Sequence, residues 1–259
     1  LDEILFLTFA AVFSGANDYV EITLFGDAKI DWLRKFLPYK HGIPSHDTLG
    51  RVFASLEPEQ FGQCFTQWVE ALRTQSGQGG LIAIDGKTAR GSGDKARGQS
   101  TLHMVSAFAT GSGLCLGQTA TESHSNEVNA IPKLLELIAL KGCLVTVDAA
   151  GCQKKIASKI RQRQGDYILQ LKTNQKALHA QVRDSFRRLV PSSTTTQFDA
   201  GHGRIEERSC RVLDDLGWIE GRNQWPGLQS LICIERTRTD KQSGHASHQT
   251  SYYISSLKL

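Results

Sequence analysis

Apolar residues recur at helical spacing through the first part of the chain. In three stretches the apolar positions lie three or four residues apart, which is the pattern of amphipathic helices. Residues 73–80 are then dominated by Gly, Gln and Ser, a composition typical of a linker. We therefore expect a helical amino-terminal domain over residues 1–75 and a second domain over residues 76–259. The three helical stretches are DEILFLTFAAVF, DWLRKFL and EQFGQCFTQWVEAL.

The segment between the second and third of these stretches has the outline of a helix-turn-helix. Residues 38–44 contain two prolines and a glycine, which favour a turn, and Ser45 or Asp47 can cap a helix that follows. A helix-turn-helix would direct Arg51 toward a DNA groove. Helix pairs of this kind also occur as ordinary core packing, so both interpretations stay open.

After residue 80 the pattern changes to short apolar runs that alternate with helical stretches. The order is β-β-β-α-β-α-β-α, with the first three strands antiparallel, and this order predicts a ribonuclease-H-like α/β fold with a mixed sheet. Expected strands span 81–87, 102–110, 114–122, 143–149 and 166–172, and expected helices span 126–140, 152–164 and 174–189.

The last part of the chain is different again. A polar stretch near residue 192 is followed by alternating segments with a loop between them. We expect residues 192–259 to form a small β-rich insertion laid onto the sheet domain.

Composition limits the class of protein. With 259 residues, of which 40% are hydrophobic, the chain can bury a sizeable core. Acidic residues lead the apolar opening, so it does not match a signal peptide, and nowhere does an apolar run reach the length of a membrane span. The six cysteines are scattered without a CxxC pair, which favours free thiols in the cytoplasm over zinc or disulfides. The formal charge of +4 is modest, but residues 87–97 and 152–163 are locally basic and could contact phosphate.

Two aspartates end two of the expected strands. The stretch LIAIDGKT is not a phosphate-binding P-loop, because Leu81 stands where that loop requires glycine. Asp85 closes the first strand and Asp148 closes the fourth, and those strands are neighbours in a ribonuclease-H-like sheet. Paired carboxylates suit bridging Mg²⁺ ions, which would support two-metal hydrolysis or transfer of phosphodiesters. Either aspartate alone could simply cap a turn.

Six stretches of the sequence carry a specific resemblance. They are IPSHDTLGRVF, LIAIDGKTARGS, SNEVNAIPKLLELIALKGCLVTVDAAGCQKKIASKI, GDYILQLKTNQKAL, HGRIEER and YYISSL. The chain resembles, over nearly all its length, the DDE transposases of the ISAs insertion-sequence group, also called H-repeat-associated proteins. The resemblance implies a ribonuclease-H-like catalytic core, Mg²⁺ or Mn²⁺ as cofactor, DNA of insertion-sequence ends and target sites as partner, and multimers on paired ends. It makes Asp85 and Asp148 the first two catalytic carboxylates.

The third acid is less defined. The resemblance implies a glutamate on a helix that follows the YYISSL strand, and the sequence stops at Leu259. Glu206 is the other candidate for a metal-binding acid. It lies in an alternating stretch, where it could equally be a strand residue paired with Arg204 or Arg208.

Four cations are candidates for holding phosphate near the metal. Lys87, Arg90, Lys154 and Lys172 come just after expected strands or in the first turn of the basic helix. Cations placed there would stabilise the charge that grows on phosphate in the transition state. Ordinary surface charge explains each of them as well.

We therefore expect an enzyme, an insertion-sequence transposase that cleaves element ends and transfers the freed 3′ hydroxyl to target DNA. A chain without its third acid could instead be a DNA-binding inhibitor that occupies element ends. A nuclease of the same fold, which hydrolyses DNA without strand transfer, would differ in its products alone.

Overall fold

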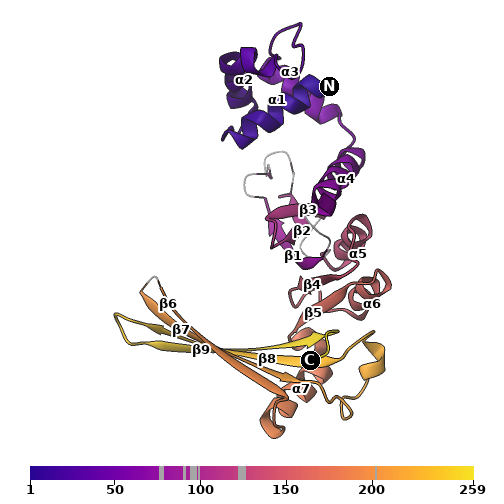
Figure 1. Ribbon diagram of the computed structural model, residues 1–259, viewed down its shortest axis with the longest axis vertical. Coiled ribbons are helices and arrows are strands. Elements are labelled where there is room, and N and C mark those ends of the chain that lie inside the picture. Colours follow the sequence, from indigo (N-terminus) through magenta and orange to yellow (C-terminus); the bar gives the residue numbers. More distant parts are fainter. Residues whose placement is uncertain (76–78, 90–91, 94–97, 99, 122–126, 202) are drawn as a thin grey trace. The chain divides into compact units, whose positions relative to one another are not determined.

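A computed structural model of the chain describes residues 1–259 except 76–78, 90–91, 94–97, 99, 122–126 and 202. It divides into two compact units, Leu1–Phe61 and Gly62–Leu259, which are described separately (Figure 1). The division falls inside helix α4 (Pro58–Gln75), earlier than the expected boundary at residue 75. The physical reason is packing: Val69 joins the core of the second unit, and the Arg73 guanidinium donates a hydrogen bond of 2.8 Å to the Ala139 carbonyl.

The first unit is helical, as expected. It contains α1 (Asp2–Phe13), α2 (Tyr19–Leu33), α3 (His46–Ser55) and the start of α4. Ser45 caps α3 by accepting a hydrogen bond from the Thr48 backbone, as the sequence predicts. The connection from α2 to α3 spans residues 34–45, which is longer than the three or four residues of a helix-turn-helix turn. The core of this first unit consists of Leu7, Ala11, Ile22, Leu33, Tyr39 and Leu49.

The second unit is built on one mixed sheet. Its strands are β1 (Gly80–Thr88), β2 (His103–Ala109), β3 (Leu114–Thr121), β4 (Cys143–Val147), β5 (Asp166–Leu171), β6 (Ser193–Gly201), β7 (Arg204–Leu213), β8 (Ser230–Asp240) and β9 (Ala246–Ser255). Their spatial order is β3-β2-β1-β4-β5-β9-β8-β7-β6. Strands β1, β4 and β5 are parallel to one another, and the other pairs are antiparallel. The expected succession of three antiparallel strands and then alternating helices and strands is confirmed.

The helices of this unit pack on one face of the sheet. Besides α4 they are α5 (Glu127–Leu137), α6 (Lys154–Gln162) and α7 (Lys176–Arg188). Figure 1 shows α5 and α6 on the same side of the central strands. Alternate side chains of β1, β4 and β5 are buried beneath these helices, and the residues between them are more exposed. The exposed set includes Asp85 and Asp148, so both carboxylates belong to the face that the helices leave open.

The carboxyl-terminal strands extend the sheet instead of lying on top of it. β9 pairs antiparallel with β5, and β8, β7 and β6 follow in turn. An edge strand offers unpaired backbone groups, and β5 would be such an edge without β9. The outer parts of the four strands project as a twisted ribbon (Figure 1), which we call the arm. The arm comprises residues 196–201, 204–209, 235–240 and 246–250.

All six cysteines lie within the described residues, and all are free, as expected. Among the described residues, no helix combines the length and apolarity required to cross a membrane.

Candidate active site

The strand register brings Asp85 and Asp148 together. β1 and β4 run parallel, and their last paired residues are Ile84 and Val147. Asp85 and Asp148 each follow directly, on neighbouring chains that lie about 4.8 Å apart in a sheet. Both side chains are exposed and share the open face. β1 itself continues to Thr88 against β2, so Asp85 lies within a strand and not at its end.

A tight turn holds Asp148 in place. Its Oδ1 atom accepts backbone hydrogen bonds from Ala150 at 3.1 Å and Gly151 at 3.3 Å. A Cβ atom at Gly151 would lie 2.1 Å from Cγ1 of Val147, so the turn leaves room for glycine alone. Both of these hydrogen bonds use Oδ1, so neither of them engages the second carboxylate oxygen of Asp148.

The segment after β5 braces the same turn from its other side. Asn174 donates its side-chain amide to the Ala149 carbonyl at 2.7 Å, and Gln175 donates to the Cys152 carbonyl at 2.9 Å. Both residues lie at the short helical turn Thr173–Gln175. The turn that carries Asp148 is therefore held by its own backbone hydrogen bonds and by the segment that follows β5.

A buried polar network lies behind β1, on the helix-covered face. His103 is 2% exposed, with its Nε2 atom 2.5 Å from Glu127 Oε1 and its Nδ1 atom 3.0 Å from the Thr88 hydroxyl. A Cβ atom at Gly86 would come within 2.5 Å of the Glu127 carboxylate and 2.8 Å of the imidazole. The network thus ties the start of α5 to the strand that carries Asp85. The sequence alone does not indicate this network, because its members are far apart along the chain.

Three of the expected phosphate-binding cations lie at this edge of the sheet. Lys87 is exposed two residues after Asp85, so both side chains emerge from the same face of β1. Lys172 is exposed immediately after β5, the strand next to β4. Lys154 opens α6, and its ammonium group donates a hydrogen bond to Gln224.

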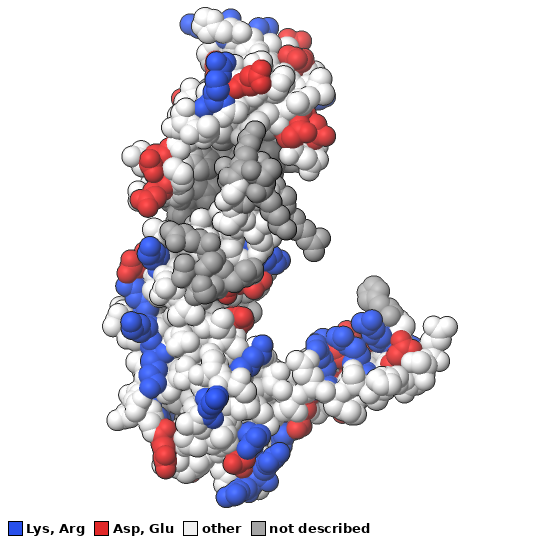
Figure 2. Space-filling view, turned by 180° about the vertical axis from the view of Figure 1, so that it is seen from behind, with Lys and Arg blue, Asp and Glu red and all other residues white. Residues whose placement is uncertain are grey.

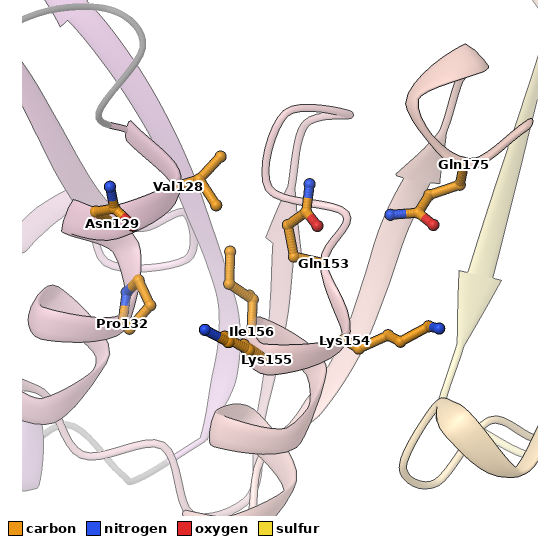
Figure 3. Close-up of a pocket in the computed structure, with 8 residues that line it drawn as sticks. All are labelled: Val128, Asn129, Pro132, Gln153, Lys154, Lys155, Ile156 and Gln175. Carbon is orange, nitrogen blue, oxygen red and sulfur yellow. The ribbon is translucent and has the colours of Figure 1, made fainter.

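A pocket of about 650 Å³ opens beside the Asp148 turn, between the first turns of α5 and α6. In Figure 3 the side chains of Lys154 and Lys155 extend from the start of α6 in opposite directions. Gln153 and Gln175 lie above them in this view. The pocket adds basic and amide groups to the same edge of the sheet. Its lining residues are Val128, Asn129, Pro132, Gln153, Lys154, Lys155, Ile156 and Gln175.

Of the remaining predicted residues, Glu206 belongs to the same unit as the carboxylate pair but is not brought to this edge. Arg90 lies outside the described residues. Arg51 is an exposed residue of α3 in the first unit, where it donates to the Thr48 hydroxyl at 3.3 Å. Glu206 lies in β7, which is four strands away from β4 in the sheet, or about 19 Å at ordinary strand spacing.

Glu206 is surrounded by arginines. Its carboxylate accepts two hydrogen bonds of 3.1 Å from Arg238, pairs with Arg208, and lies 4.0 Å from Arg236. Partial burial opposes ionisation, but the hydrogen bonds from Arg238 and Arg208 outweigh it and lower the pKa of Glu206. The sequence-based alternative of a strand residue paired with arginine therefore fits the contacts seen. Its role as third catalytic acid stays a prediction.

The carboxylate pair fits a divalent cation. Two exposed carboxylates on adjacent strands provide hard oxygen ligands, which Mg²⁺ and Mn²⁺ accept together with water and substrate phosphate. Among the described residues, no cluster of three or more His, Cys, Asp or Glu side chains has the arrangement of a metal site. Asp85 and Asp148 thus supply part of a ligand set.

Sequence comparison agrees with the resemblance. Residues 1–69 match the family described as DDE_Tnp_1-associated, and residues 76–218 match the family described as Transposase DDE domain. The chain belongs to the DDE transposases, in the H-repeat-associated group.

Relatives from two bacteria show the extent of the similarity. The putative transposase YncI of Escherichia coli O157:H7 is 40% identical over 268 residues, which covers 100% of this chain and 68% of that protein. The H repeat-associated putative transposase YhhI of Escherichia coli K12 is 38% identical over 271 residues, covering 100% and 70%. An uncharacterized protein from the dhlA 3′ region of Xanthobacter autotrophicus is 38% identical, covering 99% and 87%.

Among solved structures, a piggyBac transposase synaptic complex with hairpin DNA aligns at a TM-score of 0.36 and 11% identity. The alignment covers 71% of this chain and 34% of that one. So slight a likeness does not define the fold.

Proposed function

We propose that this transposase cleaves DNA at the ends of an insertion sequence and transfers the freed strand to target DNA, with Asp85 and Asp148 as catalytic carboxylates. The observation that carries the proposal is the register, in which both aspartates follow directly after the paired residues Ile84 and Val147 on one open face. The strand order β3-β2-β1-β4-β5 supports a ribonuclease-H-like core.

Mg²⁺ or Mn²⁺ would be held by Asp85 and Asp148. When bound, such an ion activates an attacking oxygen and neutralises charge on the scissile phosphate. The protein's own contribution is to fix the two carboxylates. The turn at Gly151 and the amides of Asn174 and Gln175 keep the Asp148 side in one conformation.

Cations at the edge of the sheet would position the DNA. Lys87 and Lys172 emerge beside the carboxylates, and the start of α6 adds Lys154. Their charges would attract the phosphate backbone and stabilise the charge that develops during displacement. Arg90 and Arg51 are proposed DNA contacts from the sequence alone.

The test is metal-dependent cleavage of a plasmid that carries the DNA flanking the reading frame. Asp85→Asn and Asp148→Asn should each reduce cleavage by at least about 10²-fold, the loss typical of removing a group that stabilises transition-state charge. DNA binding in EDTA should persist in both variants. Cleavage by both variants at the wild-type rate would contradict the proposal.

A second candidate function is a DNA-binding inhibitor derived from a transposase. The arginine pairing of Glu206 favours it, because the described residues offer no third acid beside the carboxylate pair. An inhibitor would occupy element ends equally well with Asp85→Asn. Absence of cleavage by the wild-type chain, together with end binding, would select this function.

A further inference from the structure

The four arginines of the arm all lie on one of its faces. Arg204 and Arg208 occupy alternate positions of β7, and Arg236 and Arg238 occupy alternate positions of β8. The register pairs Arg208 with Arg236, so the two strands contribute to the same face. The arm's other face has no Lys or Arg among its described residues. It has two acidic residues, Glu207 and Glu235.

The arginines outnumber the acids that accompany them. Their face also includes Glu206, Asp199 and Asp240. Four cations against three acids leave this face net positive, whereas the opposite face is net negative. Figure 2 shows basic side chains gathered along one side of the arm, which projects to the right in that view.

Glu206 holds the arginines in an ordered array. Its side chain is only 13% exposed, while those of Arg208, Arg236 and Arg238 are 50%, 36% and 37% exposed. One carboxylate cannot neutralise three guanidinium groups, so donors remain directed to solvent. Arginine donors in a fixed array suit phosphate oxygens, which they bind with charge-assisted hydrogen bonds.

Strand pairing shows that this is also the face of the carboxylates. The row through Val147 continues across β5, β9 and β8 to Leu213 of β7. The next row, on the opposite face, starts at Asp148 and reaches β7 at Val212 through Gln170, Tyr253 and Ile232. Arg204, Glu206 and Arg208 lie at even spacing from Val212 along β7, so they share the open face with Asp148. The register places Arg236 and Arg238 of β8 on the same face.

The arm also projects beyond the same edge of the sheet. Moving past Asp148 along β4 corresponds to moving from Val212 toward Arg204 along β7, since β4, β5 and β8 run in one direction and β9 and β7 in the other. At about 3.3 Å per residue and 4.8 Å per strand, the arginines lie on the order of 20–30 Å from Asp148. A DNA duplex covers that distance in about six to nine base pairs.

We propose that the arginine face of the arm binds the phosphate backbone of the DNA duplex that extends from the cleavage site. The inference rests on the proposed function for the location of the scissile bond. The recognition proposed here is through charge and independent of sequence, with the guanidinium groups contacting phosphate oxygens.

The test measures equilibrium binding of a 30-base-pair duplex of random sequence in EDTA at several salt concentrations, by fluorescence anisotropy. The test variant is Arg208→Gln with Arg236→Gln, which leaves Arg238 bonded to Glu206. The matched control is Arg183→Gln with Arg187→Gln, two arginines of α7 on the opposite side of the sheet, with side chains 42% and 69% exposed. Circular dichroism confirms that each variant is folded.

The test variant should bind on the order of tenfold more weakly at 0.1 M salt, and the slope of log affinity against log salt should fall by about 2. The control should bind like wild type. Lysine at both arm positions should restore most of the affinity, because it keeps the charge. Wild-type affinity and slope in the glutamine variant would overturn the proposal, and so would an equal loss in the control.

A second readout separates this inference from the proposed function. Asp85→Asn should keep the full salt slope while losing cleavage. If wild type does not cleave but the arm variant still loses affinity, the proposed function fails and the arm site stands. On a cleaved substrate, hydroxyl-radical footprinting should show protection about six to nine base pairs from the cut. That protection should disappear in the arm variant, and its persistence would contradict the assignment.

Discussion

At the scale of single residues, close approach of backbone explains the short motifs around the aspartates. The small residues after Asp85 and Asp148 have steric reasons to be there. Gly86 faces the Glu127 carboxylate and the buried imidazole of His103, and Gly151 faces Val147. The sequence shows that small residues follow each aspartate, and the structure shows what a larger side chain would strike.

Gly151→Ala should destabilise the protein by about 1–3 kcal/mol, the usual cost of overpacking a site that cannot relax. The added Cβ atom would lie 2.1 Å from Val147 in the core, so β4 or the turn must move. Urea denaturation measures the change. The control is Gly111→Ala, where no atom lies within 4 Å of the new methyl group. Equal stability of the two variants would contradict this packing argument.

Cys152 should be chemically inert despite its place near Asp148. Its side chain is fully buried, and burial raises the pKa of its thiol to about 12, so the thiolate is scarce at pH 8. Iodoacetamide should therefore modify the exposed Cys64 long before Cys152 in the native protein, as measured by peptide mass spectrometry. Comparable labelling of both thiols under native conditions would show that the Asp148 turn opens readily.

At the scale of elements, the segment after β5 helps to position Asp148, which follows a different strand, β4. The Asn174 amide reaches the carbonyl of Ala149, directly after Asp148. Such bracing matters because a carboxylate that holds a metal must be kept near one geometry. The sequence places Asn174 just after an expected strand but gives no indication of which backbone group it contacts.

Asn174→Ala should raise the Mg²⁺ concentration required for half-maximal cleavage several-fold, while stability falls by about 1 kcal/mol for one lost hydrogen bond. Supporting contacts of metal ligands typically change metal affinity or activity by about 10–100-fold, so an effect of this kind is expected to be measurable. Asn223→Ala, at an exposed turn elsewhere, is the control. A normal metal requirement in Asn174→Ala would limit the amide to a structural role.

At the scale of the whole molecule, two separate cores correspond to the two compact units. One core consists of residues from the first unit, and the other from the second, with no shared member. Separate cores permit each unit to unfold in its own cooperative transition.

Calorimetry should therefore resolve two transitions, and substitutions should move them independently. Leu49→Ala in the first core and Val145→Ala in the second both truncate fully buried side chains. Leu49→Ala should cost about 2–5 kcal/mol in the first transition and leave the second in place. Val145→Ala should do the reverse. A single transition that shifts in both variants would show that the units unfold together.

Much of this protein was determined by local sequence. Periodicity predicted the order of helices and strands, because alternation and helical spacing depend on neighbouring residues alone. The same order predicted that Asp85 and Asp148 meet, since parallel strands align their carboxyl ends. The paired register of Ile84 and Val147 agrees with that expectation.

Tertiary structure alone decided which strand lies beside β5, and with it the placement of the arm. Alternation in residues 192–259 predicted strands, and a possible pairing of Glu206 with Arg204 or Arg208, but not which strand these segments lie beside. Pairing between β5 and β9 joins residues far apart in sequence, and its free energy depends on the whole sheet. Pairing of β7 with β8 sets Glu206 among arginines, and pairing of β9 with β5 puts these strands on the same sheet as Asp148 but at a distance from it. The link between His103 and Glu127 behind Gly86 likewise exists only once β1, β2 and α5 have packed together.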